Sequence, residues 1–362
     1  MTKSNLSLHL HLDKLLEKCN HFPASTKVSN MVYNFNKLMN ILQKKEVFGL
    51  VGNQQLIDQT HSLSMRFMPI AQDIVTAGSK APSLEAYDLL QEEIEQTLSS
   101  DMYVFAKQWG LSVKALHFYK LGNYDKAFDF SLECVILNDY LIQQGLFTLL
   151  FRAAEQNKNI SRVFFRSGQW EKGAQLGKDL LSYLFNGKKG CLYGKIFADK
   201  AVWKEIPYVR EGYAYECFNA LVSLMIHFER RSAKEEKDVF GKMFKGLRFK
   251  INTPDRQILA HWIYIKELYY NQNYTRFLSE LIQFMQEPTS IQFDILKISI
   301  LSDAVKLAST PDYPNSVALM DKLNVLLETE LKANDFFKRD ISATNLVFLE
   351  NERPNISASR AS

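Results

Sequence analysis

The chain has 362 residues, of which 46% are hydrophobic and 23% are charged. It is therefore long enough for two ordinary domains or one extended repeat array, and apolar enough to bury a core. With only 15 Gly and 9 Pro, the composition disfavours a parallel α/β enzyme, because such folds use glycine in tight βα turns and ligand loops. The net charge of +4 does not indicate a nucleic-acid-binding domain, which is usually far more basic.

Cysteine usage and hydropathy indicate a protein of the cytoplasm. Cys19, Cys134, Cys191 and Cys217 are far apart and form no C-x-x-C pair, as expected of reduced, mostly buried thiols. Residues 1–20 lack the features of a signal peptide. Because the most apolar later stretch, 213–228, is short and interrupted by polar residues, we expect no membrane span.

The first hundred residues predict several helices. Apolar residues three and four positions apart mark an amphipathic helix over 28–45 and a second over 53–77. Ser83, followed by the acidic Glu85, is typical of the start of a third helix. We therefore expect residues 1–100 to form an N-terminal helical module.

A more informative pattern occurs three times after residue 102. It consists of an apolar helix, a short turn, an aromatic residue and, three positions later, a small residue. The turns are Gly122-Asn123-Tyr124, Gly168-Gln169-Trp170 and, more weakly, Gln272-Asn273-Tyr274. Each predicts an antiparallel pair of helices, in which the small residue lets the two helices cross closely.

These residues resemble the tetratricopeptide (TPR) repeat family. The first two units match it at Ala115, Phe118, Gly122, Tyr124, Ala127 and Cys134, and at Ser161, Phe164, Gly168, Trp170 and Gly173. The third unit departs from it, since Gln272 replaces glycine and Phe277 replaces the small residue. The resemblance implies an all-α fold, with a right-handed α-α superhelix over 101–337 and the N-terminal module before it. Further pairs are predicted at 213–229 with 233–247 and at 292–307 with 316–331, and residues 338–362 have the composition of a disordered tail.

Two short motifs resemble a metal site and a nucleotide site, but each lacks residues that such a site requires. His9 and His11 resemble the H-x-H opening of adenosine deaminase and metallo-β-lactamase sites, but Lys14 stands where the latter have histidine and no further ligand motif follows. We expect a surface-facing histidine pair on an N-terminal helix or arm. The run 173–179 is one residue short of a phosphate loop and ends in Asp. With no nucleophile and base in a recognisable order, we expect a non-enzymatic protein without cofactor or metal.

The most basic stretch runs from Arg230 to Lys250 and includes Phe244 and Phe249. Basic residues interleaved with aromatic ones are typical of grooves for single-stranded nucleic acid. Glu235, Glu236 and Asp238 lie among these residues and Glu229 directly precedes them, at spacings that allow i,i+4 ion pairs, which favours a solvated helix face. An RNA-associated helical protein is kept as an alternative function.

The resemblance also implies a concave groove lined by the first helix of each pair. The residues in register to face it are Ser112, Leu116 and ten basic or aromatic residues, with no carboxylate among them. The ten form the candidate site: Tyr119, Lys120, Lys158, Arg162, Phe165, Arg166, Trp262, Lys266, Tyr269 and Tyr270. Such a groove suits a protein or peptide that carries acidic side chains or a free C-terminal carboxylate. The leading prediction is a binding scaffold, and the first alternative is a ligand-responsive regulator whose N-terminal module docks on the repeats.

Overall fold

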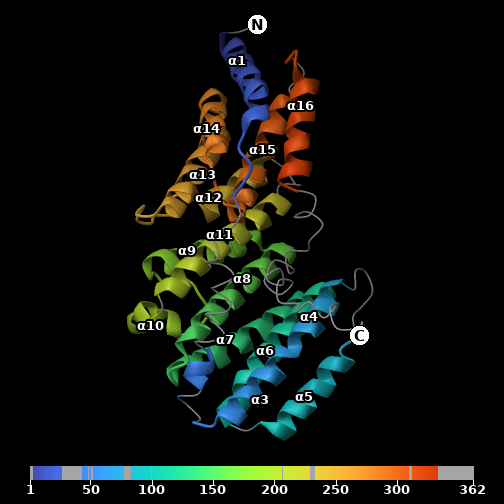
Figure 1. Ribbon diagram of the computed structural model, residues 1–362, viewed down its shortest axis with the longest axis vertical. Helices are drawn as coiled ribbons and strands as arrows, with labels where there is room; N and C mark the ends of the chain where they lie inside the picture. Colours follow the sequence, from blue (N-terminus) through green and yellow to red (C-terminus); the bar gives the residue numbers. More distant parts are fainter. Residues whose placement is uncertain are drawn as a thin grey trace, which may run out of the picture. The chain divides into compact units, whose positions relative to one another are not determined.

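A computed structural model describes residues 3–26, 43–47, 49, 52–76, 83–98, 100–205, 207–228, 233–309 and 312–332. Over these ranges the chain is all-α, as predicted, with no strand and one isolated bridge between Thr26 and Ser290 (Figure 1). Most of the helix predicted over 28–45, and the whole of the predicted tail, lie outside the described residues.

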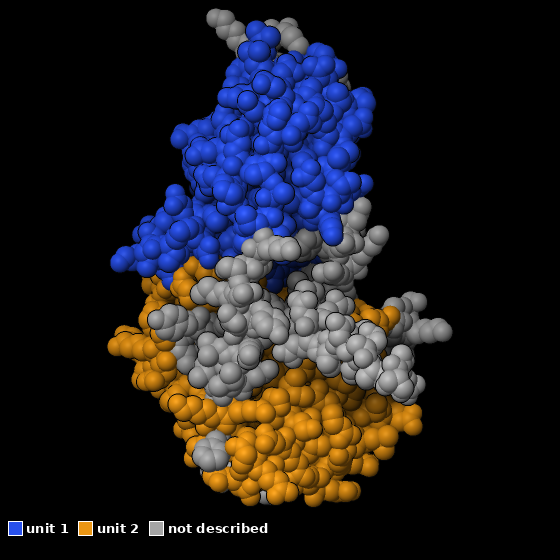
Figure 2. Space-filling view, viewed as in Figure 1, with its two compact units in different colours: residues 1–30, 218–339 blue, residues 31–217, 340–362 orange. Residues whose placement is uncertain are grey.

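The chain divides into two compact units, coloured separately in Figure 2. Unit 1 comprises residues 1–30 and 218–339, and unit 2 comprises residues 31–217 and 340–362. The boundary between residues 217 and 218 falls within helix α11 (Pro207–Phe228). This grouping differs from the predicted division at residue 100, because the N-terminal helix belongs with the C-terminal helices.

Unit 2 is built from consecutive helices that pack on their neighbours in the chain. They are α3 (Gln54–Met65), α4 (Phe67–Thr76), α5 (Glu85–Thr97), α6 (Ser100–Lys120), α7 (Tyr124–Gln143), α8 (Leu150–Arg166), α9 (Trp170–Asn186) and α10 (Lys200–Glu205). Helices α3, α4 and α5 each pack on α6. The single helix predicted over 53–77 is interrupted at Arg66, since Pro69 has no N–H to donate to the carbonyl of Met65.

Unit 1 combines the N-terminal helix with the last helices of the chain. They are α1 (Lys3–Lys18), the end of α11, α12 (Ala233–Met243), α13 (Pro254–Tyr270), α14 (Tyr274–Gln286), α15 (Asp294–Ala308) and α16 (Ser316–Val325). Helix α1 packs against α14 and α16, with Leu12, Leu15 and Cys19 buried at helical spacing. His9 is buried as well, its ring 5.5 Å from that of Tyr313. The expectation of a surface-facing histidine pair is therefore wrong for His9.

All three predicted hairpin turns are present and share one backbone geometry. Residues Gly122, Gly168 and Gln272 have φ of 73°, 82° and 60°. The next residue donates its N–H to a carbonyl five residues earlier in each case: Asn123 to Phe118 at 2.9 Å, Gln169 to Phe164 at 2.8 Å and Asn273 to Leu268 at 2.9 Å. These bonds define a Schellman-type helix end, which is why the third turn forms even though glutamine occupies the glycine position.

The small residue expected at the helix crossing is required in the second hairpin. A Cβ on Gly173 would lie 2.7 Å from Cδ2 of Phe165 and 2.8 Å from the carbonyl oxygen of Ser161. Helices α8 and α9 therefore approach too closely there for any side chain. In the third hairpin the corresponding Phe277 is fully buried, with its ring 5.2 Å from that of Tyr269, so α13 and α14 enclose an aromatic side chain at the same position.

Candidate partner-binding site

The main polar feature of unit 2 lies along helix α8, where it meets α6 and the start of α11. Most residues of α8 are buried, including four of its five charged residues. We define the inner strip by its members: Gln108, Ser112, Tyr119 and Lys120 of α6, Arg152, Glu155, Gln156, Lys158, Arg162 and Arg166 of α8, and Tyr213 and Glu216 of α11. Buried charges are rare in proteins unless they are paired, so the number of charged side chains buried in the strip is unusual.

Arg152 organises the part of the strip that faces α6. Its guanidinium carbon lies 3.9 Å from the centre of the Trp109 ring, and its Nη2 donates to Oγ of Ser112 at 2.8 Å. Its Nη1 forms an ion pair with Glu155. Gln156 also donates to Ser112, at 3.0 Å. Because stacking, ion pairing and hydrogen bonding act on one guanidinium, its position is strongly determined.

Lys158 organises the part that faces α11. Its Nζ lies 3.2 Å from the carboxylate of Glu216 and 5.4 Å from the centre of the Tyr213 ring. Burial raises the pKa of Glu216, while the Lys158 charge acts to lower it. Burial also raises the pKa of Cys217 to about 12 and that of Tyr213 well above its usual range. The thiol and the phenol are therefore protonated at neutral pH and serve as neutral polar groups.

The strip reaches the surface at the C-terminal ends of α6 and α8. Arg166 is exposed and donates from Nε to the hydroxyl of Tyr119 at 3.1 Å. Lys120 is half-buried and reaches the carbonyl oxygen of Val75 at 3.5 Å. These three side chains, Tyr119, Lys120 and Arg166, form what we call the accessible end of the strip.

The structure places the ten predicted site residues in two groups, six in unit 2 and four in unit 1. Six of the ten are buried rather than exposed: Lys158, Arg162, Phe165, Trp262, Lys266 and Tyr270. Tyr269 is half-buried. The expectation that all ten line an open surface is therefore wrong, although partner binding at the accessible positions stays a prediction.

The unit 1 residues of the predicted site form a closed core. The Trp262 ring packs against Phe218, Phe240 and Phe244 at centre distances of 5.1 to 6.2 Å. Lys266 is fully buried and pairs with the equally buried Asp303 at 2.6 Å. Two of the five predicted cations lie beside carboxylates outside the predicted set, because Lys158 pairs with Glu216 and Lys266 pairs with Asp303. These carboxylates come close to the lysines only because their helices meet in the folded chain. They are not at groove-facing positions of the repeat register, so the register could not reveal them.

Sequence reasoning also missed Gln108, Arg152, Glu155 and Gln156. Arg152, Glu155 and Gln156 lie on α8 at positions i, i+3 and i+4. Polar residues at this spacing normally indicate a solvated helix face. The available signal was the density of polar residues on one face of α8, from Arg152 to Arg166. The sequence contains no sign that this face is buried, because burial depends on which helices cover it.

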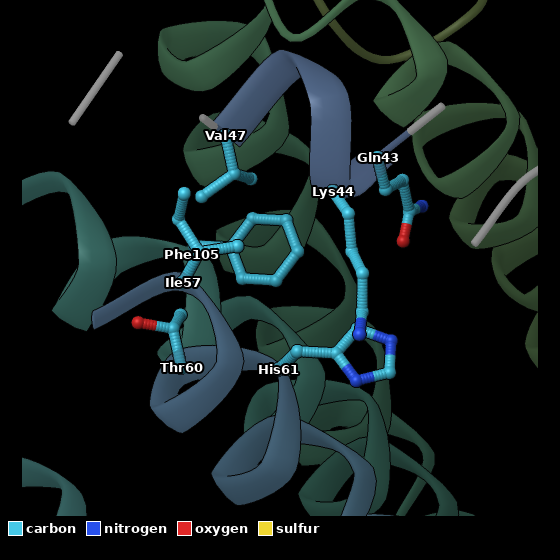
Figure 3. A pocket seen from close by; sticks show the side chains of 7 residues that line it. All are labelled: Gln43, Lys44, Val47, Ile57, Thr60, His61 and Phe105. Carbon is cyan, nitrogen blue, oxygen red and sulfur yellow. The ribbon is translucent and has the colours of Figure 1, made fainter. Parts of the chain in front are cut away.

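A small pocket lies elsewhere in unit 2, beneath the helical residues 43–47. It is lined by Gln43, Lys44, Val47, Ile57, Thr60, His61 and Phe105 (Figure 3). The space inside it is about that of one water molecule, so the pocket is too small for most ligands, whose sites usually span roughly 300–1,000 Å³. Nearby, Glu46 accepts hydrogen bonds from the backbone N–H and the hydroxyl of Thr148, and burial raises its pKa to about 7.

No protein-family model, curated protein or solved structure matches the chain. Within the described ranges, no three His, Cys, Asp or Glu side chains come together as metal ligands would. None of the helices described is long and apolar enough to cross a membrane. The run 173–179 lies inside α9, where a helical backbone offers no amide nest for phosphate. The site must accordingly be interpreted from its own geometry.

Proposed function

We propose that the chain is a non-enzymatic helical-repeat scaffold that binds an extended peptide or protein segment at the accessible end of the inner strip. The partner contacts Tyr119, Lys120 and Arg166, which supply an aromatic ring and two cations. An acidic side chain or a free C-terminal carboxylate is the chemistry that best fits this end.

The observation that carries the proposal is the ordered polar network of the inner strip. Removing an ion from water costs several kcal/mol even after pairing, and apolar residues would pack α6, α8 and α11 together at lower cost. A network whose members are fixed by stacking and hydrogen bonds loses little entropy when it binds a ligand. The competing explanation is that the network only fixes how the helices pack, and the experiment must separate the two.

The test is selection of peptides from a random library against the full chain, followed by affinity measurement on charge-reversed variants. The double variant Lys120→Glu with Arg166→Glu removes both cations of the accessible end. We expect selected peptides to be acidic, and their affinity to fall at least tenfold in this variant, which corresponds to about 1.4 kcal/mol. Amidation of the peptide C-terminus separates a terminal carboxylate from acidic side chains.

A matched control makes the same change in net charge at residues outside the strip. Lys200 and Lys204 are exposed residues of α10, so Lys200→Glu with Lys204→Glu alters net charge equally. Equal loss of affinity in both double variants would contradict the proposal, as would a library that yields no binder. A thermal midpoint close to that of the unmodified chain is required of each variant before affinities are compared.

A second candidate function is a ligand-responsive regulator, and the N-terminal segment favours it. Asp13 of α1 accepts hydrogen bonds from Tyr313 and Asn315, each at 2.9 Å. Ser25 donates to Asp294 at 2.5 Å and accepts from Lys297 at 2.8 Å. These polar contacts hold the N-terminal segment on α15 and α16 of unit 1 in a form that a ligand could displace. Hydrogen exchange over residues 3–26 that is unchanged by every selected peptide would exclude this role.

A further inference from the structure

Helix α12 of unit 1 presents a strongly basic outer face. Its inner side buries Glu236, Val239, Phe240 and Met243. The exposed cations of the helix and of the residues that follow it are Lys234, Lys237, Lys242, Lys245, Arg248 and Lys250, and we call these six the α12 basic surface. Arg230 and Arg231, which precede them, lie outside the described residues.

One of the carboxylates that the sequence placed among these cations points away from them. Glu236 is only 5% exposed and turns inward, where it pairs with Lys306 of α15 at 2.7 Å. Asp238 is the one fully exposed carboxylate of α12, and Glu235 is half-buried. Within the described part of the chain, none of Lys234, Lys237, Lys242 and Lys250 forms an ion pair. The surface is therefore more positive than its composition indicates.

Of the two aromatic residues in the sequence pattern, Phe249 is half-buried and Phe244 is absent from this surface. Phe244 is fully buried, with its ring 5.1 Å from that of Trp262, so it cannot stack on a base. The exposed face of α12 itself carries no large apolar side chain. Protein partners and membranes both need apolar or aromatic anchors, and single strands need stacking platforms. A regular array of negative charges needs only cations.

We propose that the α12 basic surface binds the phosphate backbone of double-helical DNA without reading its sequence. Lys237 and Lys242 lie roughly 140° apart around the helix axis, at about 100° per residue. An α-helix with its side chains is about 10–12 Å wide, close to the width of about 12 Å of the B-form major groove. The two lysines therefore point toward opposite phosphate walls, while Lys234 lies between them.

The experiment measures fluorescence anisotropy of the full chain with a labelled duplex of about 20 bp over a series of salt concentrations. If four to six phosphates are neutralised, the plot of log K against log salt has a slope of about −4 to −5. The same strand without its complement, an RNA duplex and poly-glutamate are measured in parallel. We expect duplex DNA to bind most tightly.

The variant Lys234→Gln, Lys237→Gln, Lys242→Gln should weaken duplex binding and make the slope shallower by about 2 to 3. The control is Lys188→Gln, Lys200→Gln, Lys204→Gln, which removes three equally exposed lysines from unit 2 and should leave both quantities unchanged. No duplex binding at about 50 mM salt, an equal effect of the control, or tighter binding of single-stranded DNA, RNA duplex or poly-glutamate would overturn the proposal. Peptide selection tests the proposed function and duplex binding tests this inference. The two measurements are independent, so one proposal can fail while the other stands.

Discussion

The hairpins α8–α9 and α13–α14 share their turn but differ in what their helices enclose. Both end the first helix on a residue with positive φ, Gly168 in one and Gln272 in the other. At the crossing, Gly173 leaves no space for a Cβ, whereas Phe277 fills the corresponding place. The path of the turn is set by backbone hydrogen bonds, and the crossing is set by side-chain volume, so the two vary independently.

The two hairpins also bury a lysine in different ways. Lys158 pairs with Glu216, whose side chain is 26% exposed, but Lys266 and Asp303 are both fully buried. Partial exposure lets water screen the first pair, while the second pair is shielded from water. The comparison therefore predicts unequal sensitivity to the same kind of mutation.

The largest expected effect is the loss of the buried carboxylate in unit 1. Asp303→Ala removes the carboxylate paired with the buried Lys266 and should cost about 3–5 kcal/mol, while Glu216→Ala should cost less because Lys158 can gain water. Urea midpoints of the full chain, combined with hydrogen exchange in α13 and α8, measure the two losses. The double variant Lys266→Met with Asp303→Leu should recover most of the stability. Equal losses in the two single variants would contradict the distinction.

The next effect concerns the close crossing. Gly173→Ala forces a Cβ against Phe165 and the Ser161 carbonyl, and should cost about 1–3 kcal/mol by overpacking. The matched control is Gly241→Ala on α12, where a Cβ meets nothing within 4 Å, and a gain of about 0.5–1 kcal/mol is expected. Thermal unfolding of both variants compares them. A neutral Gly173→Ala would mean that α8 and α9 separate easily.

Exchange of the turn residues should give a smaller effect. Gly168→Gln places a side chain at a φ of 82° and should cost about 1 kcal/mol. Gln272→Gly relieves the same strain at a φ of 60° and should gain up to about 1 kcal/mol, less the added entropy of the unfolded chain. Thermal midpoints of the two variants should move in opposite directions. Movement in the same direction would show that contacts of Gln272 outweigh its backbone strain.

The smallest effect is a pH dependence at the start of α8. Thr253 caps α13 locally, but Thr148, just before α8, bonds to the remote Glu46. Because burial raises the pKa of Glu46 from 4.5 to about 7, the folded state holds this proton more tightly. The contribution of protonated Glu46 to the free energy of unfolding is present below about pH 4.5 and is lost as the pH rises through 7. Partial exposure of Glu46 reduces the effect by solvent screening.

Hydrogen exchange at the start of α8 between pH 5 and 8, corrected for intrinsic rates, measures this dependence. Glu46→Gln should remove the pH-dependent part, and the start of α13 is the internal control. A similar pH dependence at both helix starts would contradict the role of Glu46.

The sequence predicted the local geometry of the molecule well and its burial poorly. The hairpin turns at Gly122, Gly168 and Gln272 were readable because a helix end depends on a few neighbouring residues. The interruption at Arg66 was missed, although Pro69 carried the signal. The exposure of the predicted site was misjudged at Lys158 and Lys266, since their partners Glu216 and Asp303 lie 58 and 37 residues away in the chain.

By itself, the sequence determined that this protein is all-α and where three of its helix pairs turn. Helical periodicity and turn chemistry act over a few residues, so they are encoded locally. Only the tertiary structure decided that α1 joins the C-terminal helices, that Arg152, Lys158 and Lys266 are buried beside carboxylates, and that Glu236 turns away from the outer face of α12. Each of these depends on which helices meet, and that is fixed by packing between residues distant in the chain.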